Sequence, residues 1–127
     1  MNIETYSNKA VIAIDQDTLG RQGERIVGGP LSPKIDTNVW AKPLANGDVA
    51  LAFANPSGTA MSIECDRNCF QTAFGVLPLA SQVCAIELWT KRKVMVDPSK
   101  GMRAGKVSAN GGIQIYRISR TSSCPYL

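Results

Sequence analysis

The sequence predicts an all-β protein: an antiparallel β-sandwich of seven or eight strands, of the Greek-key type, preceded by a short helix. Apolar and polar residues alternate with a period of two through most of the chain after residue 37. Turn residues such as Asn-Gly and Pro-Ser-Gly separate these short runs. The length of 127 residues, 44% of them apolar, suits one domain with one core.

The first segment differs from the rest because its apolar residues recur at helical spacing. Asn8 can cap a helix, and the pattern predicts a helix over residues 8–18. Residues 20–36 are rich in Gly and Pro and predict a connection, with a short strand at Glu24–Val27. The chain offers this helix no amphipathic partner, so the helix resembles the end of a larger unit.

The first clear pair of strands follows the connection. Residues 37–45 and 48–55 are predicted to form a hairpin around Asn46-Gly47, because both central residues of a type I′ turn need a positive φ. The second strand has large apolar residues on one face and three alanines on the other. We therefore expect it near the middle of a sheet whose second face is at least partly covered.

The remaining strands are short and are separated by turns. They are predicted over residues 59–64, 83–89, 94–96, 102–109 and 112–119. The last two are expected to pair as a hairpin around Asn110-Gly111. The final strand has Ile113 and Ile115 on one face but Tyr116 and Ile118 on the other, which predicts a bulge or a strand that crosses a sheet corner.

Four cysteines allow three full pairings: Cys65, Cys69, Cys84 and Cys124. The polar residues between Cys65 and Cys69 predict a loop that could close a small disulfide ring, and two free thiols in a reducing compartment are the alternative. Cys84 lies inside an apolar run, so we expect it to be a buried small hydrophobe. Cys124 lies in a polar tail and is expected to be free.

The composition excludes several functions. The chain has no histidine, which excludes Ser-His-Asp and Cys-His catalysis and removes the commonest metal ligand. Cys65 and Cys69 form one close pair with no second pair, so no metal or cofactor is predicted. The net charge of +4 is scattered, and its densest run, Lys91-Arg92-Lys93, has no interleaved aromatic residue. Nucleic acid is therefore not expected as a partner.

No segment suggests a membrane or a leader sequence. No stretch approaches the ~20 apolar residues of a membrane span, so no membrane partner is expected. Residues 1–6 lack the basic and apolar regions of a signal peptide. A segment cut from the middle of a secreted precursor would look the same, so the missing signal does not identify the compartment.

The carboxylates do not form a pair suited to acid–base catalysis. Asp15 and Asp17 are two residues apart, so they point in different directions on a helix. Glu64 and Asp66 lie at a strand end, where exposed carboxylates are ordinary, and Glu87 is predicted to lie on an open sheet face. We therefore predict no catalytic residue in this chain.

Two tryptophans are the candidate sugar-binding residues, because an aromatic ring offers an apolar face to a pyranose. These are Trp40 and Trp89, with Tyr116 and Tyr126 as further aromatic residues. The alternative is that both tryptophans pack in the core or against another domain. Each is expected within an alternating strand rather than at a loop tip, which favours the packing role.

One long motif resembles a known family. The stretch Asn8-Lys9-Ala10-Val11-Ile12-Ala13-Ile14-Asp15-Gln16-Asp17-Thr18-Leu19-Gly20-Arg21-Gln22-Gly23 resembles a hallmark of glycoside hydrolase family 27, the α-galactosidases (melibiases) and α-N-acetylgalactosaminidases. The family usually has Asn at position 15 and Pro at position 18. Weaker similarities follow in the family's order at residues 39–44, 49–55, 65–70 and 87–89. The third of these is similar to a C-x3-C-Phe element whose cysteines are bonded in some animal members.

The resemblance implies a domain organisation. In that family the helix closes a (β/α)8 barrel, and an antiparallel β-sandwich follows it. Residues 1–23 would then be the end of the catalytic barrel, and residues 24–127 the C-terminal antiparallel β domain. A barrel takes about 250 residues, so it does not fit in this chain. The family's two catalytic aspartates lie on barrel strands, and no position here matches either motif.

The resemblance therefore implies a non-catalytic C-terminal domain of a retaining α-galactosidase-type glycoside hydrolase, whose parent enzyme cleaves terminal α-D-galactosyl residues. The expected partner is the barrel of the same protein, with a homodimer contact as a further possibility. A secreted or lysosomal/vacuolar location is implied, and the choice between galactose and N-acetylgalactosamine stays open. Two alternatives remain: a free-standing carbohydrate-binding module that uses Trp40 or Trp89, and a gene product that has lost its barrel.

Overall fold

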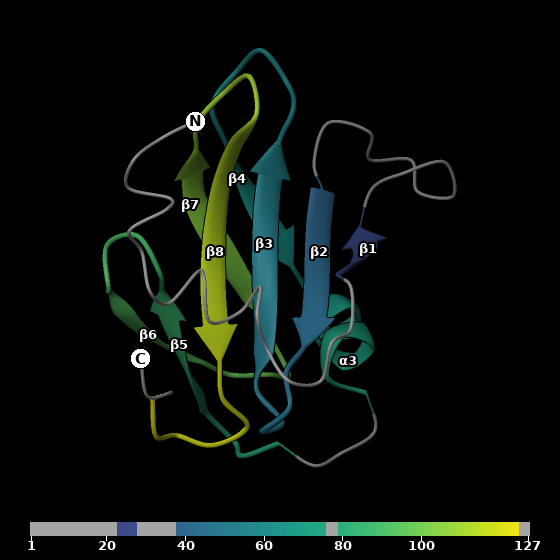
Figure 1. Ribbon diagram of the computed structural model, residues 1–127, viewed down its shortest axis with the longest axis vertical. Helices are drawn as coiled ribbons and strands as arrows, with labels where there is room; N and C mark the ends of the chain where they lie inside the picture. Colours follow the sequence, from purple (N-terminus) through teal and green to yellow (C-terminus); the bar gives the residue numbers. More distant parts are fainter. Residues whose placement is uncertain (1–22, 28–37, 76–78, 125–127) are drawn as a thin grey trace.

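The computed structural model describes residues 23–27, 38–75 and 79–124. Within these ranges the chain forms two antiparallel sheets, one behind the other in Figure 1, with one short helix beside them. This confirms the predicted β-sandwich. The helix predicted over residues 8–18 and most of the connection over residues 20–36 lie outside the described residues.

The described part of the chain has eight strands, within the predicted number. The larger sheet has the order β1-β2-β3-β8-β5-β6, and the smaller sheet contains β4 and β7. The strands are β1 (Glu24–Val27), β2 (Asn38–Pro43), β3 (Val49–Asn55), β4 (Met61–Cys65), β5 (Val83–Glu87), β6 (Lys93–Val96), β7 (Met102–Val107) and β8 (Gly112–Ile118). β8 lies between β3 and β5 in the larger sheet.

The core lies between the two sheets, and β3 is at its centre. As predicted, β3 is a middle strand, paired with β2 on one side and β8 on the other. Its inward residues Val49, Leu51 and Phe53 are at most 1% exposed. The Phe53 ring meets the Tyr116 ring of β8 edge to face at 5.7 Å between centroids. The smaller sheet closes this core with inward residues of both its strands, such as Ile63 and Ala104.

A short helix stands where a polar loop was expected. Helix α3 (Arg67–Phe74) begins directly after Asp66, whose carboxylate accepts a hydrogen bond from the Cys69 N–H at 2.9 Å. Asp is a strong N-cap, because this bond satisfies an amide that has no partner inside the helix. Phe70 and Phe74 are buried on the inner side of α3. The loop prediction was wrong because it read the polar first turn without the apolar residues that follow.

The first hairpin is present, but its turn differs from the predicted type I′ turn. The Gly47 N–H donates to the Leu44 carbonyl, and the Leu44 N–H donates to the Asp48 carbonyl. These bonds enclose a three-residue loop in which Gly47 has a φ of 91°, whereas Asn46 is not among the residues with positive φ. Such loops place the glycine in third position rather than using two positive-φ residues.

The last two strands do not form the predicted hairpin. β7 pairs with β4 in the smaller sheet, whereas β8 pairs with β3 and β5 in the larger sheet. Asn110 and Gly111 do have positive φ, as in a tight turn, but here the turn joins two sheets. The bulge predicted in β8 is also absent, because its pairing with β3 is regular from Gly112 to Ile118. Ile113 and Ile115 instead face outward on a regular strand.

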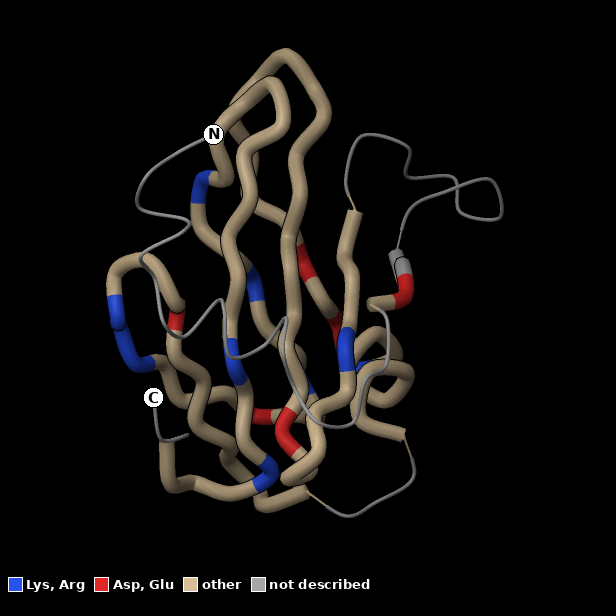
Figure 2. Tube along the Cα trace, in the orientation of Figure 1, with Lys and Arg blue, Asp and Glu red and all other residues tan. Residues whose placement is uncertain are grey.

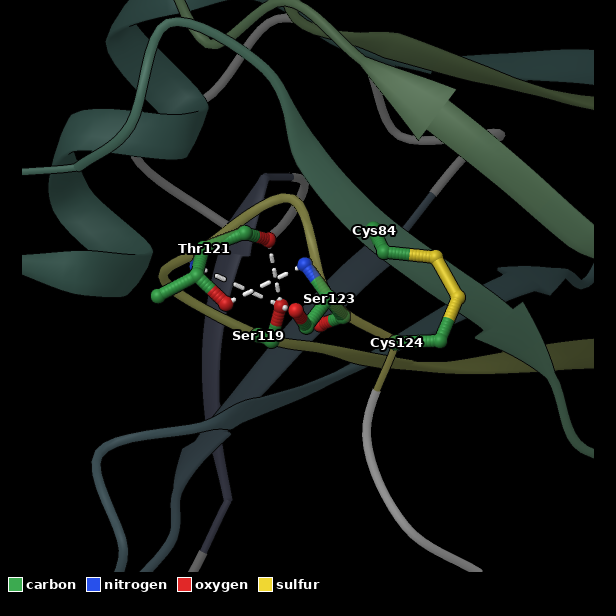
Figure 3. Close-up of a disulfide and its surroundings, with 5 residues drawn as sticks. All are labelled: Cys84, Ser119, Thr121, Ser123 and Cys124. Carbon is green, nitrogen blue, oxygen red and sulfur yellow. Dashed lines mark hydrogen bonds between the residues drawn. A yellow bond between two sulfur atoms is a disulfide. The ribbon is translucent and has the colours of Figure 1, made fainter.

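The structure contains two disulfides. Cys65 and Cys69 are bonded, as predicted, with their Cα atoms 5.1 Å apart. Cys84 is buried, as predicted, but it is also bonded to Cys124, so the prediction that Cys124 is free was wrong. Figure 3 shows this bond beside the turn of the C-terminal segment.

The hydrogen bonds of this turn explain the second disulfide. The Cys84 N–H donates to the Thr121 carbonyl at 2.9 Å, and the Ser119 N–H donates to the Cys84 carbonyl at 3.0 Å. The Ser119 hydroxyl lies within 2.7 Å of the Thr121 and Ser123 carbonyls. The polar tail therefore turns back along β5 and brings Cys124 to Cys84.

Candidate functional site

The outward face of the larger sheet has an apolar region across its three central strands. The register places Trp40 of β2 opposite Ala52 of β3, and Ala52 opposite Ile115 of β8. Ala54 and Ile113 are paired in the neighbouring position. Trp40 is 41% exposed and Ile113 is 50% exposed. We call these five residues the apolar sheet face, and Figure 2 shows no charged residue along this part of β3 and β8.

Charged residues border the apolar sheet face at the next row of the sheet. Lys42, Ala50 and Arg117 are paired across β2, β3 and β8. The Arg117 Nε lies 2.9 Å from the Asp48 Oδ2, and both side chains are largely buried. The apolar region is therefore bounded on one side by a positioned ion pair and a lysine.

The outward face of the smaller sheet is polar. Ser62 and Glu64 of β4 and Arg103 of β7 are exposed, whereas their neighbours along the strands point into the core. The Arg103 Nη2 lies 2.9 Å from the Glu64 Oε2, with side chains that are 65% and 47% exposed. This alternation is what a sheet with one solvated face requires.

Trp89 was predicted to lie within the strand over residues 83–89. In the structure it lies in the turn after β5, which ends at Glu87. It is partly buried and lines a cavity of about 360 Å³. The other lining residues are Glu87, Thr90, Arg92, Gly105, Gln114 and Tyr116. Trp40 is not among the residues that line this cavity, so the two tryptophans do not form one site.

Glu87 is on the inner side of the sheet, so the prediction of an open-face position was wrong. It is 5% exposed, and its carboxylate accepts hydrogen bonds from the Trp89 N–H and from the N–H and hydroxyl of Thr90. These bonds hold the turn that ends β5. Burial raises the pKa of the Tyr116 hydroxyl, and the nearby negative charge of Glu87 adds to this rise.

Other described carboxylates also stabilise local structure. Asp48 pairs with Arg117, Glu64 pairs with Arg103, and Asp66 caps α3. Asp97 accepts hydrogen bonds from the hydroxyl and N–H of Ser99, which hold the pKa of its carboxyl below the usual value. Each of these carboxylates therefore has a structural partner. Asp15 and Asp17 lie outside the described residues.

Among the described residues, no three or more Cys, Asp or Glu side chains gather where they could hold a metal ion. Of the helices in the part of the chain that the structure describes, none has the length and apolar character needed to cross a membrane.

The sequence contained a signal for the apolar sheet face that was interpreted differently. The alanines of β3 were recognised as a second apolar face, but the change of face between Ile115 and Tyr116 was attributed to a bulge or to a strand that crosses a sheet corner. The structure shows Ile113 and Ile115 on the same regular outward face as the alanines. Of the two predicted sugar-binding residues, Trp40 lies on this face and Trp89 at the separate cavity.

Comparisons with known proteins agree on one domain family. The model of the alpha galactosidase C-terminal beta sandwich domain matches residues 34–118. The alpha-galactosidase of Lachancea cidri is 36% identical over 72 residues, which are 53% of this chain and 15% of that protein. Alpha-galactosidase 2 of Arabidopsis thaliana is 36% identical over 63 residues, which are 50% of this chain and 15% of that protein. The matched segments thus cover about half of this chain and about one-seventh of each of these relatives.

A solved structure extends the similarity to nearly the whole chain. Alpha-galactosidase I from Mortierella vinacea superposes with a TM-score of 0.75 and 18% identity, over 96% of this chain and 29% of that chain. At this identity the superposition supports the fold, and the domain model supports the family. This chain belongs to the family of alpha galactosidase C-terminal β-sandwich domains, which are found in glycoside hydrolase family 27 enzymes.

Proposed function

We propose that this chain is the non-catalytic C-terminal domain of a retaining α-galactosidase-type glycoside hydrolase, whose parent enzyme cleaves terminal α-D-galactosyl residues. The match of residues 34–118 to the C-terminal domain model is the observation that favours this role most strongly. In this proposal residues 1–23 are the last part of the catalytic barrel, and residues 24–127 are the β domain. A secreted or lysosomal/vacuolar location agrees with two disulfides, because such bonds persist in oxidising compartments.

The described carboxylates support a non-catalytic role. A retaining glycosidase needs two carboxyl groups on either side of the scissile bond, about 5–5.5 Å apart. Glu87 and Asp66 are used within their own turn and helix, and Asp48 and Glu64 are paired with arginines. A carboxylate that already accepts such bonds is poorly placed to act as a nucleophile or acid.

The proposal is tested with an aryl α-galactoside. The 127-residue chain is expected to release no more phenol than a blank, whereas the full-length parent enzyme is expected to turn the substrate over. NMR of the first sugar product of the parent enzyme is expected to show the α-anomer, as retention requires. Turnover by the isolated chain would contradict the non-catalytic role, and a β-anomer would contradict retention.

The cavity beside Trp89 supports a second candidate function, a carbohydrate-binding module. It combines an indole with Gln114, Arg92 and the Tyr116 hydroxyl, which are side chains that commonly bind sugars. Titration of the chain with galactose, followed by NMR, is the appropriate test. Saturable shifts of the Trp89 indole and of the neighbouring Gln114 amide signals, with the Gln114 shifts lost in Trp89→Ala, would support the module. Absence of shifts at millimolar sugar would leave the interdomain role as the explanation of the domain.

A further inference from the structure

We infer that the apolar sheet face of the larger sheet is the surface on which this domain packs against the catalytic barrel of the same polypeptide. The inference rests on the proposed function, because it takes the barrel as the occupant. It goes further by assigning the contact to one of the two outward faces of the sandwich and to five residues: Trp40, Ala52, Ala54, Ile113 and Ile115.

The geometry of these residues suits a broad contact. They lie in two adjacent rows of a regular sheet, so their side chains project from the same face. Ile113 is half exposed and Trp40 only slightly less so. Ala52 lies between Trp40 of β2 and Ile115 of β8, and Ala54 lies opposite Ile113. Helices of a neighbouring layer pack on such a surface.

The smaller sheet provides an internal comparison. Its outward residues Ser62, Glu64 and Arg103 are exposed and polar, and two of them form an ion pair. On the outward face of the larger sheet, Ile115 packs against the buried Ile86 and Leu88. Trp40 and Ile113 remain 41% and 50% exposed, so the two buried clusters do not account for the position of these two apolar side chains. An exposed apolar region with a charged border is typical of an interaction site. Lys42 and the Arg117–Asp48 pair form part of that border.

The length of the relatives indicates the occupant. The superposed region covers 96% of this chain but only 29% of the Mortierella vinacea enzyme, so most of that chain lies outside this domain. The matching model is a C-terminal domain, so the missing part precedes it in sequence. In the proposed parent enzyme the barrel is linked to β1, which is a strand of the larger sheet. This covalent linkage gives the barrel a high effective concentration near the larger sheet. A second copy of this chain is the alternative occupant, and the experiment separates the two.

Cysteine accessibility tests the assignment. Ile113→Cys and Ser62→Cys each place one thiol on an outward face, and all four native cysteines are in disulfides. In the 127-residue chain both thiols are expected to react rapidly with a maleimide. In the full-length enzyme, Ile113→Cys should react at least about tenfold more slowly, because a covered thiol reacts only after local opening. Ser62→Cys should keep its rate.

The outcomes distinguish the inference from the proposed function. Equal rates for Ile113→Cys in the full-length enzyme and the isolated chain, with the enzyme active, would overturn the inference and leave the proposed function standing. Protection in the isolated chain that grows with protein concentration would overturn it in favour of a second copy. Absence of α-galactosidase activity from the full-length wild-type protein would instead contradict the proposed function. Ala54→Cys serves as a second variant if Ile113→Cys does not fold.

Discussion

The two sheets of the sandwich share a core but differ in the faces they turn away from it. The smaller sheet has alternating strands, with apolar residues inward and Ser62, Glu64 and Arg103 outward. The larger sheet is apolar on its inward face and also on part of its outward face, where Trp40 and Ile113 are prominent among its exposed side chains. The outward face of the smaller sheet is therefore suited to solvent. The composition of the larger sheet is that of a middle layer, with the core on one side and a further packed layer on the other. From this difference we infer that the apolar side of the domain meets the barrel of the proposed parent enzyme.

The inward face of the larger sheet should matter most for stability. Phe53→Ala removes a side chain that is fully buried and meets Tyr116. The free energy of unfolding of the isolated chain should fall by about 3–5 kcal/mol, as measured by urea denaturation. Ile113→Ala, on the outward face of the neighbouring strand, should cost less than about 0.5 kcal/mol in the same chain. Similar losses for the two variants would mean that the isolated chain already buries Ile113.

The two disulfides should differ in their contribution to the stability of the two sheets. Cys84 and Cys124 are 40 residues apart and tie the C-terminal segment to the larger sheet, whereas Cys65 and Cys69 are 4 residues apart and join β4 to α3. Loop-closure entropy predicts a loss of about 4 kcal/mol for the double variant Cys84→Ala/Cys124→Ala and about 2 kcal/mol for Cys65→Ala/Cys69→Ala. Thermal unfolding of both variants checks the order. A greater loss for the short ring would show that native packing, not closure entropy, controls the effect.

The Arg117–Asp48 and Arg103–Glu64 ion pairs, both among the described residues, should give the smallest differences in stability. Arg117→Met leaves Asp48 largely buried without its arginine, so the chain should lose about 1–3 kcal/mol of unfolding free energy. Arg103→Met affects an exposed pair on the smaller sheet and should cost less than about 1 kcal/mol. Urea denaturation at low and high salt measures both. If the Arg103 variant lost more, the smaller sheet would not be an ordinary solvated face.

Strand positions could be predicted from the sequence because they depend on local alternation and on turn residues. The runs around Val49–Asn55 and Val83–Glu87 are apolar and short, and both are strands in the structure. The pairing of β7 could not be predicted in this way, because β4 is distant in sequence and only the closed sandwich brings the two together. The Asn110-Gly111 signal was interpreted as a hairpin because the local turn is the same whether the strands that follow share a sheet or separate.

Site residues were harder to predict because they depend on the third dimension. The pairing of Cys84 with Cys124 follows from a backbone turn at Ser119 and Thr121, which sequence spacing does not reveal. Glu87 was misplaced because alternation alone does not indicate that a carboxylate can turn inward to bond its own turn. The apolar sheet face was partly visible as a second set of apolar residues in β3, but its continuation through Ile113 and Ile115 required the register of β8.

A structure of the full-length parent enzyme tests the central claim most directly, through the exposure of two side chains. Ile113 is 50% exposed in the isolated chain. Our account predicts that side chains from a preceding (β/α)8 barrel bury Ile113 and Trp40, while Ser62 on the opposite face stays in solvent. A barrel seated on Ser62 and Glu64, with Ile113 still exposed, would contradict it.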